Sequence, residues 1–342
     1  MWRTIDYGVK SVMKKLALRL MRNCGAFALA RAMSAGMARI LMYHNFCGPG
    51  QTGTDAVSLA VVRSQLAYLR RHFRVVPLAR VIEQLKSDER LDGLTVALTI
   101  DDGRRNCYEF LFPLLAEFAM PATFFVVSSF IAREDWVWTD KVLWLSDQPS
   151  CPDELSPGKI EKLFGILNQM RPAPRDACIA AIAASIGVSI PKEAPPKYAP
   201  CSWSELREMA DSGLVEIGSH TLTHPILASI TDEESWHELT VSRSQIEEGL
   251  GRQINSFCFP NGKPGDYRPS QVRQIMDAGY TSAVVARPGM VANGANPYEL
   301  PRIGVSGHSD GVSFSKDLDG AEYYQAKLRS LLGLRDAHEN HF

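Results

Sequence analysis

Short apolar runs rich in β-branched and aromatic residues recur along the chain, and such runs predict buried strands. Eight of them occupy residues 38–43, 73–76, 94–100, 122–127, 215–218, 254–259, 280–285 and 300–305. Most are continuous rather than alternating with polar residues, a pattern typical of strands covered on both faces. The hydrophobic pattern therefore predicts a largely parallel sheet.

Helical patterns with recognisable ends separate most of the predicted strands. Ser202 with Glu205, and Thr231 with Glu234, match the capping box that closes the first turn of a helix. Glycines suited to end a helix stand at Gly213, Gly251 and Gly279. Alternating strands and helices predict an α/β architecture, and eight strand candidates favour a (β/α) barrel over an open sheet.

The stretch from about residue 132 to 200 interrupts this alternation. It contains helical patterns at 156–169 and 175–186, followed by a proline-rich loop. We interpret it as a helical insertion on one rim of the barrel. Its three tryptophans either anchor the core of the insertion or offer a flat face to a sugar ring, and they are Trp136, Trp138 and Trp144.

Two terminal segments flank the predicted barrel, which we place at residues 37–310. Residues 1–36 are basic and partly amphipathic, so they form either a helix on an anionic membrane surface or a helix packed on the barrel. No uncharged run there approaches the roughly 20 residues that span a bilayer, and the apolar stretch 25–30 is short for a signal-peptide core. The tail, residues 311–342, is predicted to hold a helix at 321–332 that ends at Gly333.

Composition narrows the class of protein. With 342 residues, 45% hydrophobic and 22% charged, the chain resembles a soluble globular enzyme rather than a disordered protein. A net charge of −1 gives no general attraction to nucleic acid, which we exclude as a partner. Seven irregularly spaced cysteines with no C-x-x-C pair match neither a disulfide framework nor a zinc finger. Free thiols suit a reducing compartment, so we expect a cytoplasmic protein, free or at the inner membrane, rather than a periplasmic one.

Two adjacent carboxylates, Asp101 and Asp102, directly follow the predicted strand 94–100 and precede Gly103. An Asp-Gly pair by itself is typical of a turn. Two neighbouring negative charges repel each other, however, unless a positive charge lies between them or one is neutralised. A bound cation would remove this repulsion.

Two histidines, His220 and His224, follow the predicted strand 215–218. A spacing of four places both on one face of a helical turn, and it suits two ligands of one metal ion. Together with one carboxylate they make three protein ligands. Catalytic zinc sites use three protein ligands and leave the next position to water.

Further polar residues stand at the ends of other predicted strands. His44 follows 38–43, and the turn Phe259-Pro260-Asn261-Gly262 follows 254–259, where it could direct backbone N–H groups to a site. Arg302 lies within 300–305 and is costly to bury unpaired, so we expect it to meet a carboxylate, with Asp101 as the candidate. The carboxyl ends of parallel barrel strands share one face, where active sites are built.

Two of these motifs resemble those of the polysaccharide deacetylase family, also called the NodB-homology or carbohydrate esterase 4 family. Thr99-Ile100-Asp101-Asp102-Gly103 is similar to its first motif, Thr-Phe-Asp-Asp-Gly, and 220–224 fits its second, His-(Ser/Thr)-x-x-His. The resemblance covers residues 40–305 apart from the insertion. It implies a distorted (β/α) barrel with fewer than eight regular units.

The resemblance also implies roles for individual residues. Asp101 would be the catalytic base, and the metal ligands would be Asp102, His220 and His224. The divalent metal would be Zn²⁺ in the first place, with Co²⁺, Ni²⁺, Fe²⁺ or Mn²⁺ as alternatives.

The later motifs depart from the family pattern. The third motif usually carries an arginine that pairs with the base, but Cys258 occupies that place here, so Arg302 is expected to substitute. The fifth usually supplies a Leu-x-His general acid, whereas only Gly307-His308 is found nearby. The Tyr43-His44 pair and the 259–262 turn look more like the branch that acts on exopolysaccharides such as poly-N-acetylglucosamine. In that branch the early histidine serves as the acid, so we favour His44 over His308.

These resemblances imply metal-dependent hydrolysis of the N-acetyl amide of an amino sugar in a polysaccharide or oligosaccharide, with release of acetate. The expected substrate contacts are the turn residues Phe259, Pro260, Asn261 and Gly262, together with Trp138. Two alternatives stay open. One is a deformylase or deacetylase of a lipid-linked amino sugar at the inner membrane, and the other is an inactive carbohydrate-binding barrel.

Overall fold

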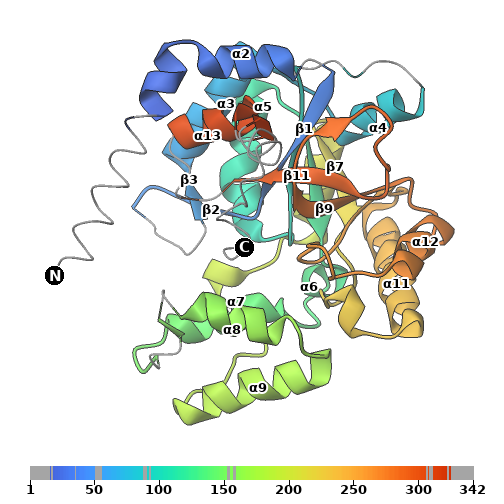
Figure 1. Ribbon diagram of the computed structural model, residues 1–342. Coiled ribbons are helices and arrows are strands. Elements are labelled where there is room, and N and C mark those ends of the chain that lie inside the picture. Colours follow the sequence, from blue (N-terminus) through green and yellow to red (C-terminus); the bar gives the residue numbers. More distant parts are fainter. Residues whose placement is uncertain are drawn as a thin grey trace, which may run out of the picture.

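A computed structural model of the chain describes residues 16, 18–34, 36–50, 56–87, 91, 94–151, 155–156, 159–305, 307, 311–321 and 323–324. The barrel, the helices around it and most of the insertion lie within these ranges (Figure 1). The alternative acid His308 lies outside them, as do residues 1–15 and most of the helix predicted at 321–332.

Seven parallel strands form a closed barrel, which confirms the predicted distorted (β/α) barrel. In chain order they are β1 (Met37–Tyr43), β5 (Thr95–Ile100), β6 (Ala122–Val126), β7 (Val215–Ser219), β8 (Ser256–Cys258), β9 (Ser282–Pro288) and β11 (Leu300–Gly304). The ring closes because β1 pairs in parallel with both β5 and β11. The barrel thus has fewer than eight regular units.

The eighth predicted strand lies beside the ring. It is β4 (Arg74–Val75), which pairs only with the first residues of β5. Three further short strands were not predicted, and they are β2 (Asn45–Cys47), β3 (Ala56–Ser58) and β10 (Val291–Ala292). Of these, β10 runs antiparallel to the start of β1, and β2 pairs in parallel with β3.

The helices that cover the barrel are α3 (Leu59–His72), α4 (Leu78–Lys86), α5 (Phe112–Phe118), α10 (Trp203–Asp211), α11 (Asp232–Leu250) and α12 (Pro269–Asp277), with a π-helical turn at Cys107–Leu111. Both predicted capping boxes are formed, at the starts of α10 and α11. All three predicted stop glycines have a positive φ, which glycine adopts without the steric cost of a side chain.

The barrel strands are buried on both faces. Every residue of β5 and of β6 is buried, with one face toward the barrel interior and the other toward the helices. This environment explains why their sequences read as continuous apolar runs rather than alternating ones.

The predicted insertion is a helical layer with its own apolar core. It contains α7 (Trp138–Ser146), α8 (Ile160–Leu167) and α9 (Pro172–Ser185), and α6 (Ser128–Ile131) directly precedes it. Helices α7, α8 and α9 lie together at one end of the molecule (Figure 1). Side chains of all three pack into one hydrophobic cluster, which includes Val142, Leu167 and Ile179.

The opposite end carries α2 (Ala26–Met33), with α13 (Gly311–Leu318) nearby (Figure 1). Phe27 and Ala30 of α2 pack against Ala321, and Arg31 forms an ion pair with Asp319 at 3.0 Å. Within the described ranges, no helix combines the length and the apolar character needed to cross a membrane.

Candidate metal and catalytic centre

The carboxyl ends of the barrel strands bring the predicted site residues together. The Asp101 N–H donates to the Tyr43 carbonyl at 2.9 Å, so β5 and β1 end side by side and His44 lies next to Asp101. The His220 N–H donates in the same way to the Val126 carbonyl at 2.9 Å. Backbone pairing at the rim of the barrel thus positions residues that lie far apart in sequence.

Asp102, His220 and His224 direct three acceptor atoms to one point. Asp102 Oδ1 lies 3.7 Å from His220 Nε2 and 3.6 Å from His224 Nε2. The two Nε2 atoms are 3.2 Å apart. These separations match tetrahedral coordination, in which metal–ligand bonds of about 2.0–2.1 Å place the ligand atoms about 3.3 Å from each other.

The protonation of the two imidazoles also fits a cation. His220 Nδ1 lies 2.8 Å from the Cys258 carbonyl, which accepts a hydrogen bond from the Nδ1–H group and so leaves the lone pair of Nε2 for a metal ion. Burial lowers the pKa of His220, and burial together with the neighbouring His220 lowers the pKa of His224 to about 3. Both rings are therefore neutral at neutral pH, the state in which imidazole binds metals.

The loop that carries the histidines is not helical, so the predicted helical turn is wrong. Residues 220–226 contain no helix, with bends at Leu222 and Thr223, and Thr221 and His224 have φ angles of 69° and 60°. Asp102, with a φ of 76°, is in the same left-handed region. Such conformations cost of order 1–3 kcal/mol each and persist only where the surroundings hold them. The two imidazoles meet because of this loop geometry and not because of helical periodicity.

Glu238 of α11 holds this loop and was missed by the sequence analysis. Its carboxylate accepts hydrogen bonds from the Leu222 and Thr223 N–H groups at 2.8 and 2.9 Å. It also accepts one from the Thr223 hydroxyl at 2.6 Å. A glutamate within an amphipathic helix normally faces solvent, so the sequence carried no signal for this role.

Asp101 and Arg302 form a buried bidentate ion pair. Arg302 Nη1 and Nη2 donate to the two Asp101 oxygens at 2.8 and 2.7 Å, the contact expected from the sequence. Arg302 also donates to the Thr99 hydroxyl at 3.0 Å. Burial raises the pKa of Asp101, but Arg302 and the nearby histidines outweigh it and bring the pKa below its usual range. Asp101 is therefore a carboxylate at neutral pH.

Cys258 lies beside this pair. Its sulfur is 3.1 Å from Arg302 Nη2 and 3.5 Å from Asp101 Oδ2. The residue at the place of the family arginine thus contacts Asp101, while the guanidinium that binds Asp101 comes from β11 instead.

His44 lies at the open side of the site. Its Nε2 is 3.7 Å from Asp101 Oδ2, and its side chain is 40% exposed, whereas Asp101 is buried. This position gives His44 access both to Asp101 and to solvent.

The turn after β8 contributes less than predicted. The side chain of Phe259 is buried against Tyr267, and its N–H donates to the Val284 carbonyl at 3.2 Å, so it is not available to a substrate. Pro260 is buried as well. Gly262 has a φ of 61°, and a Cβ there would lie 2.9 Å from the Ala286 nitrogen, so this glycine serves the turn itself. Of the four turn residues, only Asn261 has a backbone N–H for which the described residues offer no partner.

The prediction that Trp138 contacts substrate is wrong. Its side chain is 3% exposed, and the Arg175 guanidinium lies over its ring at 4.8 Å. Its indole Nε1 donates to the His224 carbonyl at 3.2 Å. Trp138 therefore anchors the insertion against the loop that carries the two histidines, which leaves no ring face for a sugar.

The sequence analysis also missed two charged residues of the site, Arg104 and Asp140. Arg104 Nη2 is 3.1 Å from Asp102 Oδ2. Arg104 in turn forms an ion pair with Asp140 of α7. Nothing in the sequence connects Asp140 with a residue at the end of β5.

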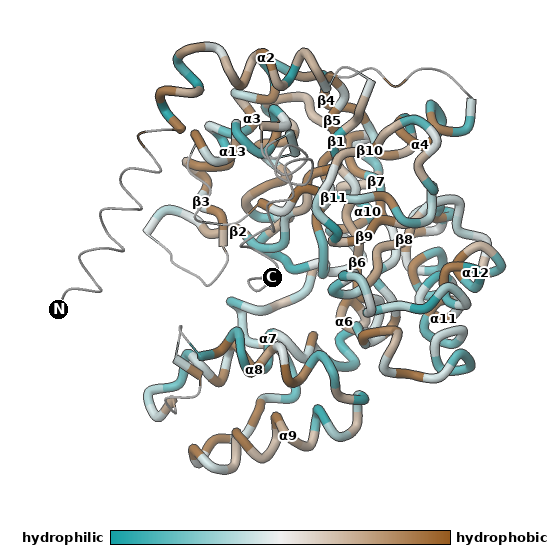
Figure 2. Tube along the Cα trace, in the orientation of Figure 1, coloured by the Kyte–Doolittle hydropathy of each residue, from teal (hydrophilic) through white to brown (hydrophobic). Residues whose placement is uncertain are grey.

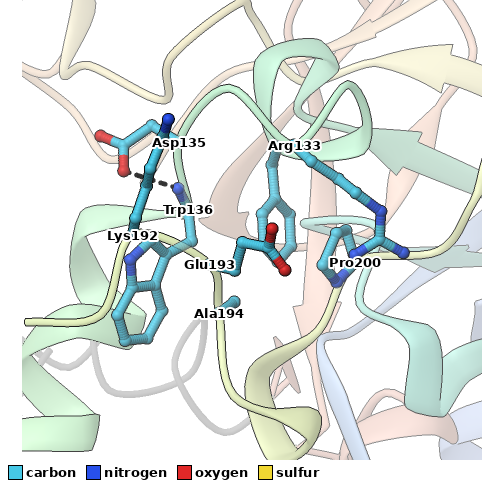
Figure 3. A pocket seen from close by; sticks show the side chains of 8 residues that line it. Arg133, Asp135, Trp136, Lys192, Glu193, Ala194 and Pro200 are labelled. Atoms are coloured by element: carbon cyan, nitrogen blue, oxygen red, sulfur yellow. Dashed lines mark hydrogen bonds between the residues drawn. The ribbon is translucent and has the colours of Figure 1, made fainter.

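A small hollow on the insertion side lies apart from this cluster. Figure 3 shows it between Arg133 and the segment from Lys192 to Pro200, with Trp136 at its wall. None of the predicted site residues lines it. The chemistry of the site therefore rests on the cluster at the barrel rim.

Comparison with known proteins agrees with the family resemblance found in the sequence. The family model for polysaccharide deacetylase matches residues 88–283. The Bacillus subtilis (strain 168) protein named "Putative polysaccharide deacetylase YxkH" is 26% identical over 110 residues, which are 32% of this chain and 38% of that protein. The match therefore spans well under half of that relative's length.

Solved structures share the fold. The deacetylase PplD of Streptococcus pyogenes, in complex with acetate, has a TM-score of 0.57 and 16% identity, over 83% of this chain and 99% of that one. IcaB of Ammonifex degensii has a TM-score of 0.58 and 20% identity, over 84% and 98%. A de-N-acetylase of Aggregatibacter actinomycetemcomitans has a TM-score of 0.58 and 17% identity, over 82% and 99%.

Proposed function

The chain belongs to the polysaccharide deacetylase family, and on this basis we propose that it hydrolyses the N-acetyl amide of an amino sugar within a polysaccharide or oligosaccharide in a metal-dependent reaction. One observation carries the proposal. Two imidazole nitrogens and a carboxylate oxygen lie 3.2–3.7 Å from one another, directly beside a second, ionised carboxylate.

The metal would be held by Asp102, His220 and His224. Zinc is our first candidate because two histidines and one carboxylate are a ligand set of catalytic zinc sites. When bound there, a divalent cation supplies Lewis acidity, which polarises a carbonyl and lowers the pKa of water.

Asp101 is the proposed base. Arg302 uses both of its terminal nitrogens to hold the carboxylate in one orientation and in its ionised form. The carboxylate therefore accepts the proton of the attacking water at once, without first losing a proton of its own. The strong ion pair also weakens Asp101 as a base, so its contribution depends on position more than on basicity.

His44 is the proposed general acid. It approaches Asp101 Oδ2 and is open to solvent, so its imidazolium is placed to protonate the departing amine nitrogen. Such proton transfer contributes about 10²–10⁴-fold to a rate. The free N–H of Asn261 is the remaining candidate of its turn for a hydrogen bond to the developing oxyanion.

A reconstitution assay tests this function. Protein stripped of metal is assayed for acetate and free amine release from N-acetylglucosamine oligomers, before and after zinc is added back. We expect release only after addition, with cobalt, nickel, iron and manganese compared in parallel. Binding of the oligomers with no acetate release under any of these metals would contradict the proposal and favour an inactive carbohydrate-binding barrel.

Two further arms separate the acyl group and the acceptor. N-formyl and N-acetyl substrates are compared by formate and acetate release, and a lipid-linked amino sugar is compared with free oligomers. We expect acetate from the oligomers to dominate. Faster release of acetate or formate from the lipid-linked amino sugar would contradict the proposed glycan and favour the lipid-linked substrate.

A further inference from the structure

The two oxygens of Asp102 face different partners. Oδ1 faces the two imidazoles, as described above, whereas Oδ2 lies 3.1 Å from Arg104 Nη2. Arg104 follows Gly103 at the end of β5, and its side chain is buried. A buried positive charge next to a proposed metal ligand competes with a cation for that ligand, unless the positive charge is balanced.

Asp140 of the insertion supplies the balancing charge. Arg104 Nε donates to Asp140 Oδ2 at 2.9 Å, and Nη2 donates to Oδ1 at 2.5 Å. The side chain of Asp140 has no exposed surface. Apolar residues of similar volume often stabilise a buried position as well as an ion pair does, so this charged pair is not explained by stability alone.

The same helix reaches a second metal ligand. Trp138, two residues before Asp140 on α7, donates its indole N–H to the His224 carbonyl. One helix of the insertion therefore contacts the loop of one ligand directly and the carboxylate of another through Arg104. Groups that hold metal ligands in this way typically affect metal affinity by 10–100-fold.

We propose that Asp140 is a positioning residue of the metal site, which balances the charge of Arg104 and so keeps Asp102 available to a cation. This proposal rests on the metal site of the proposed function. If it holds, the insertion contributes to metal binding through Asp140.

The test is metal affinity. Zinc binding to metal-stripped wild-type protein and to Asp140→Asn is measured by calorimetry, and thermal unfolding of both metal-free proteins checks their folding. The control is Asp147→Asn, because Asp147 contacts Lys197 and Tyr198 within the insertion, away from the ligands. We expect the dissociation constant to rise 10–100-fold in Asp140→Asn and to stay unchanged in the control.

A double variant guards against a folding defect. Arg104→Met with Asp140→Leu removes both buried charges. Because the competing guanidinium is then gone, we expect this variant to fold and to bind zinc more tightly than Asp140→Asn, with an affinity close to that of the wild type. Wild-type affinity in Asp140→Asn, or an affinity of the double variant as weak as that of Asp140→Asn, would overturn the charge-balancing role while leaving the metal site intact. A wild-type protein that binds no zinc, cobalt or manganese would refute the proposed function itself.

A second, independent observation concerns the segment from Leu16 to Met33. Of the eight large hydrophobic residues that are exposed in the described part of the chain, four lie in this segment: Leu16, Leu20, Leu29 and Met33, which are 56–63% exposed. The opposite side of the segment packs, through Phe27 and Ala30, on Ala321 and on Val312 of α13. A helical segment with apolar residues on both sides is normally covered on both.

The charge of this region indicates what covers it. Residues 7–36 contain six basic residues and no acidic one, and Arg19 and Arg22 are exposed within the segment. Apolar side chains interleaved with positive charges are complementary to a lipid surface with anionic headgroups. Figure 2 shows apolar stretches along α2 and the turns before it.

We propose that this segment docks on an anionic lipid surface. Because α2 precedes the start of β1 whereas the site lies beyond its end, a seven-residue strand of roughly 20 Å separates the lipid from the site. Figure 1 shows α2 and the insertion at opposite ends of the molecule. A docked protein would thus open its site toward water, which suits a soluble glycan better than a lipid-linked one.

Vesicle sedimentation tests this surface. The full chain is mixed with phosphatidylcholine vesicles that contain or lack phosphatidylglycerol, at low and high salt. We expect binding only to the anionic vesicles, weakened by salt, and at least a tenfold weaker partition for Leu20→Gln with Leu29→Gln. The control is Ile166→Gln, which replaces an exposed residue of α8. Failure of the wild type to bind, equal binding of the double variant, or a dimer that this variant dissociates would overturn the proposal.

Discussion

Two neighbouring aspartates at the end of β5 are held in different ways. Asp101 is paired with Arg302, which comes from the last strand of the barrel. Asp102 is paired with Arg104 from its own turn, and Arg104 depends on Asp140 from the insertion. The proposed base is thus supported by the barrel alone, whereas the proposed metal ligand also needs the insertion. We call Asp101 with Arg302 the base side of the site, and Asp102 with the two histidines its metal side.

The largest expected effect separates these two sides directly. Asp101→Asn removes the proposed base but none of the three ligands, so we expect activity to fall by about 10²–10⁴-fold while zinc still binds. Steady-state rates and calorimetry on the same preparation measure both quantities. Near-normal turnover would show that Asp101 is not the base.

The next largest effect is expected in protein stability, when Arg302 is removed. Arg302→Met leaves the Asp101 carboxylate buried without its partner, and breaking a buried pair in this way costs about 3–5 kcal/mol of unfolding free energy. Denaturant unfolding measures the change. Arg63→Met removes an arginine from an exposed pair with Glu117 and should change stability far less. Equal effects of the two substitutions would contradict the conclusion that the buried pair with Arg302 stabilises Asp101.

The metal side should respond to mild acid, and the base side should not. His224 has its pKa lowered to about 3 by burial and by His220, so below pH 6.5 the unfolded chain binds a proton that the folded protein does not. His224 alone should therefore lower the stability of the metal-free protein by about 1.4 kcal/mol for each pH unit below 6.5, down to about pH 3.

The lowered pKa of Asp101 confines its own titration to more acid conditions. Urea unfolding of metal-free protein at pH 7, 6 and 5 measures the slope, with His224→Gln as the comparison. Persistence of the same slope in His224→Gln would assign it to other groups.

The smallest expected effect concerns the loop between the histidines. Glu238→Gln turns an acceptor of three hydrogen bonds into a group that also donates, and two backbone N–H groups lose a good partner. We expect a loss of about 1–3 kcal/mol in stability together with weaker zinc binding, since the loop positions both imidazoles. Glu233→Gln, on the first turn of the same helix, is the control. Unchanged stability and unchanged zinc affinity in Glu238→Gln would show that Glu238 does not hold the loop of the two histidines.

The sequence predicted the barrel well because its strands are apolar on both faces. All eight predicted strands exist, although β4 lies beside the ring. The expected contact between Arg302 and Asp101 was also found, because a buried arginine in an apolar strand requires a carboxylate. Physical requirements of this kind are local enough to be read from the sequence.

The missed features depend on tertiary contacts. His220 and His224 meet through left-handed loop residues held by Glu238, and no periodicity encodes that arrangement. Trp138 appeared suited to a sugar, but it is buried in an insertion whose packing depends on helices predicted only approximately. The pairing of Arg104 with Asp140 joins two segments that only the folded chain brings together.

Metal content tests the central claim most directly. The purified protein and a His220→Ala variant are analysed by mass spectrometry for all first-row divalent metals, after each has been equilibrated with zinc and desalted. We predict about one equivalent of metal in the wild type and a nearly complete loss in the variant, with both proteins folded by circular dichroism. Equal metal content in the two proteins would contradict the site formed by Asp102, His220 and His224.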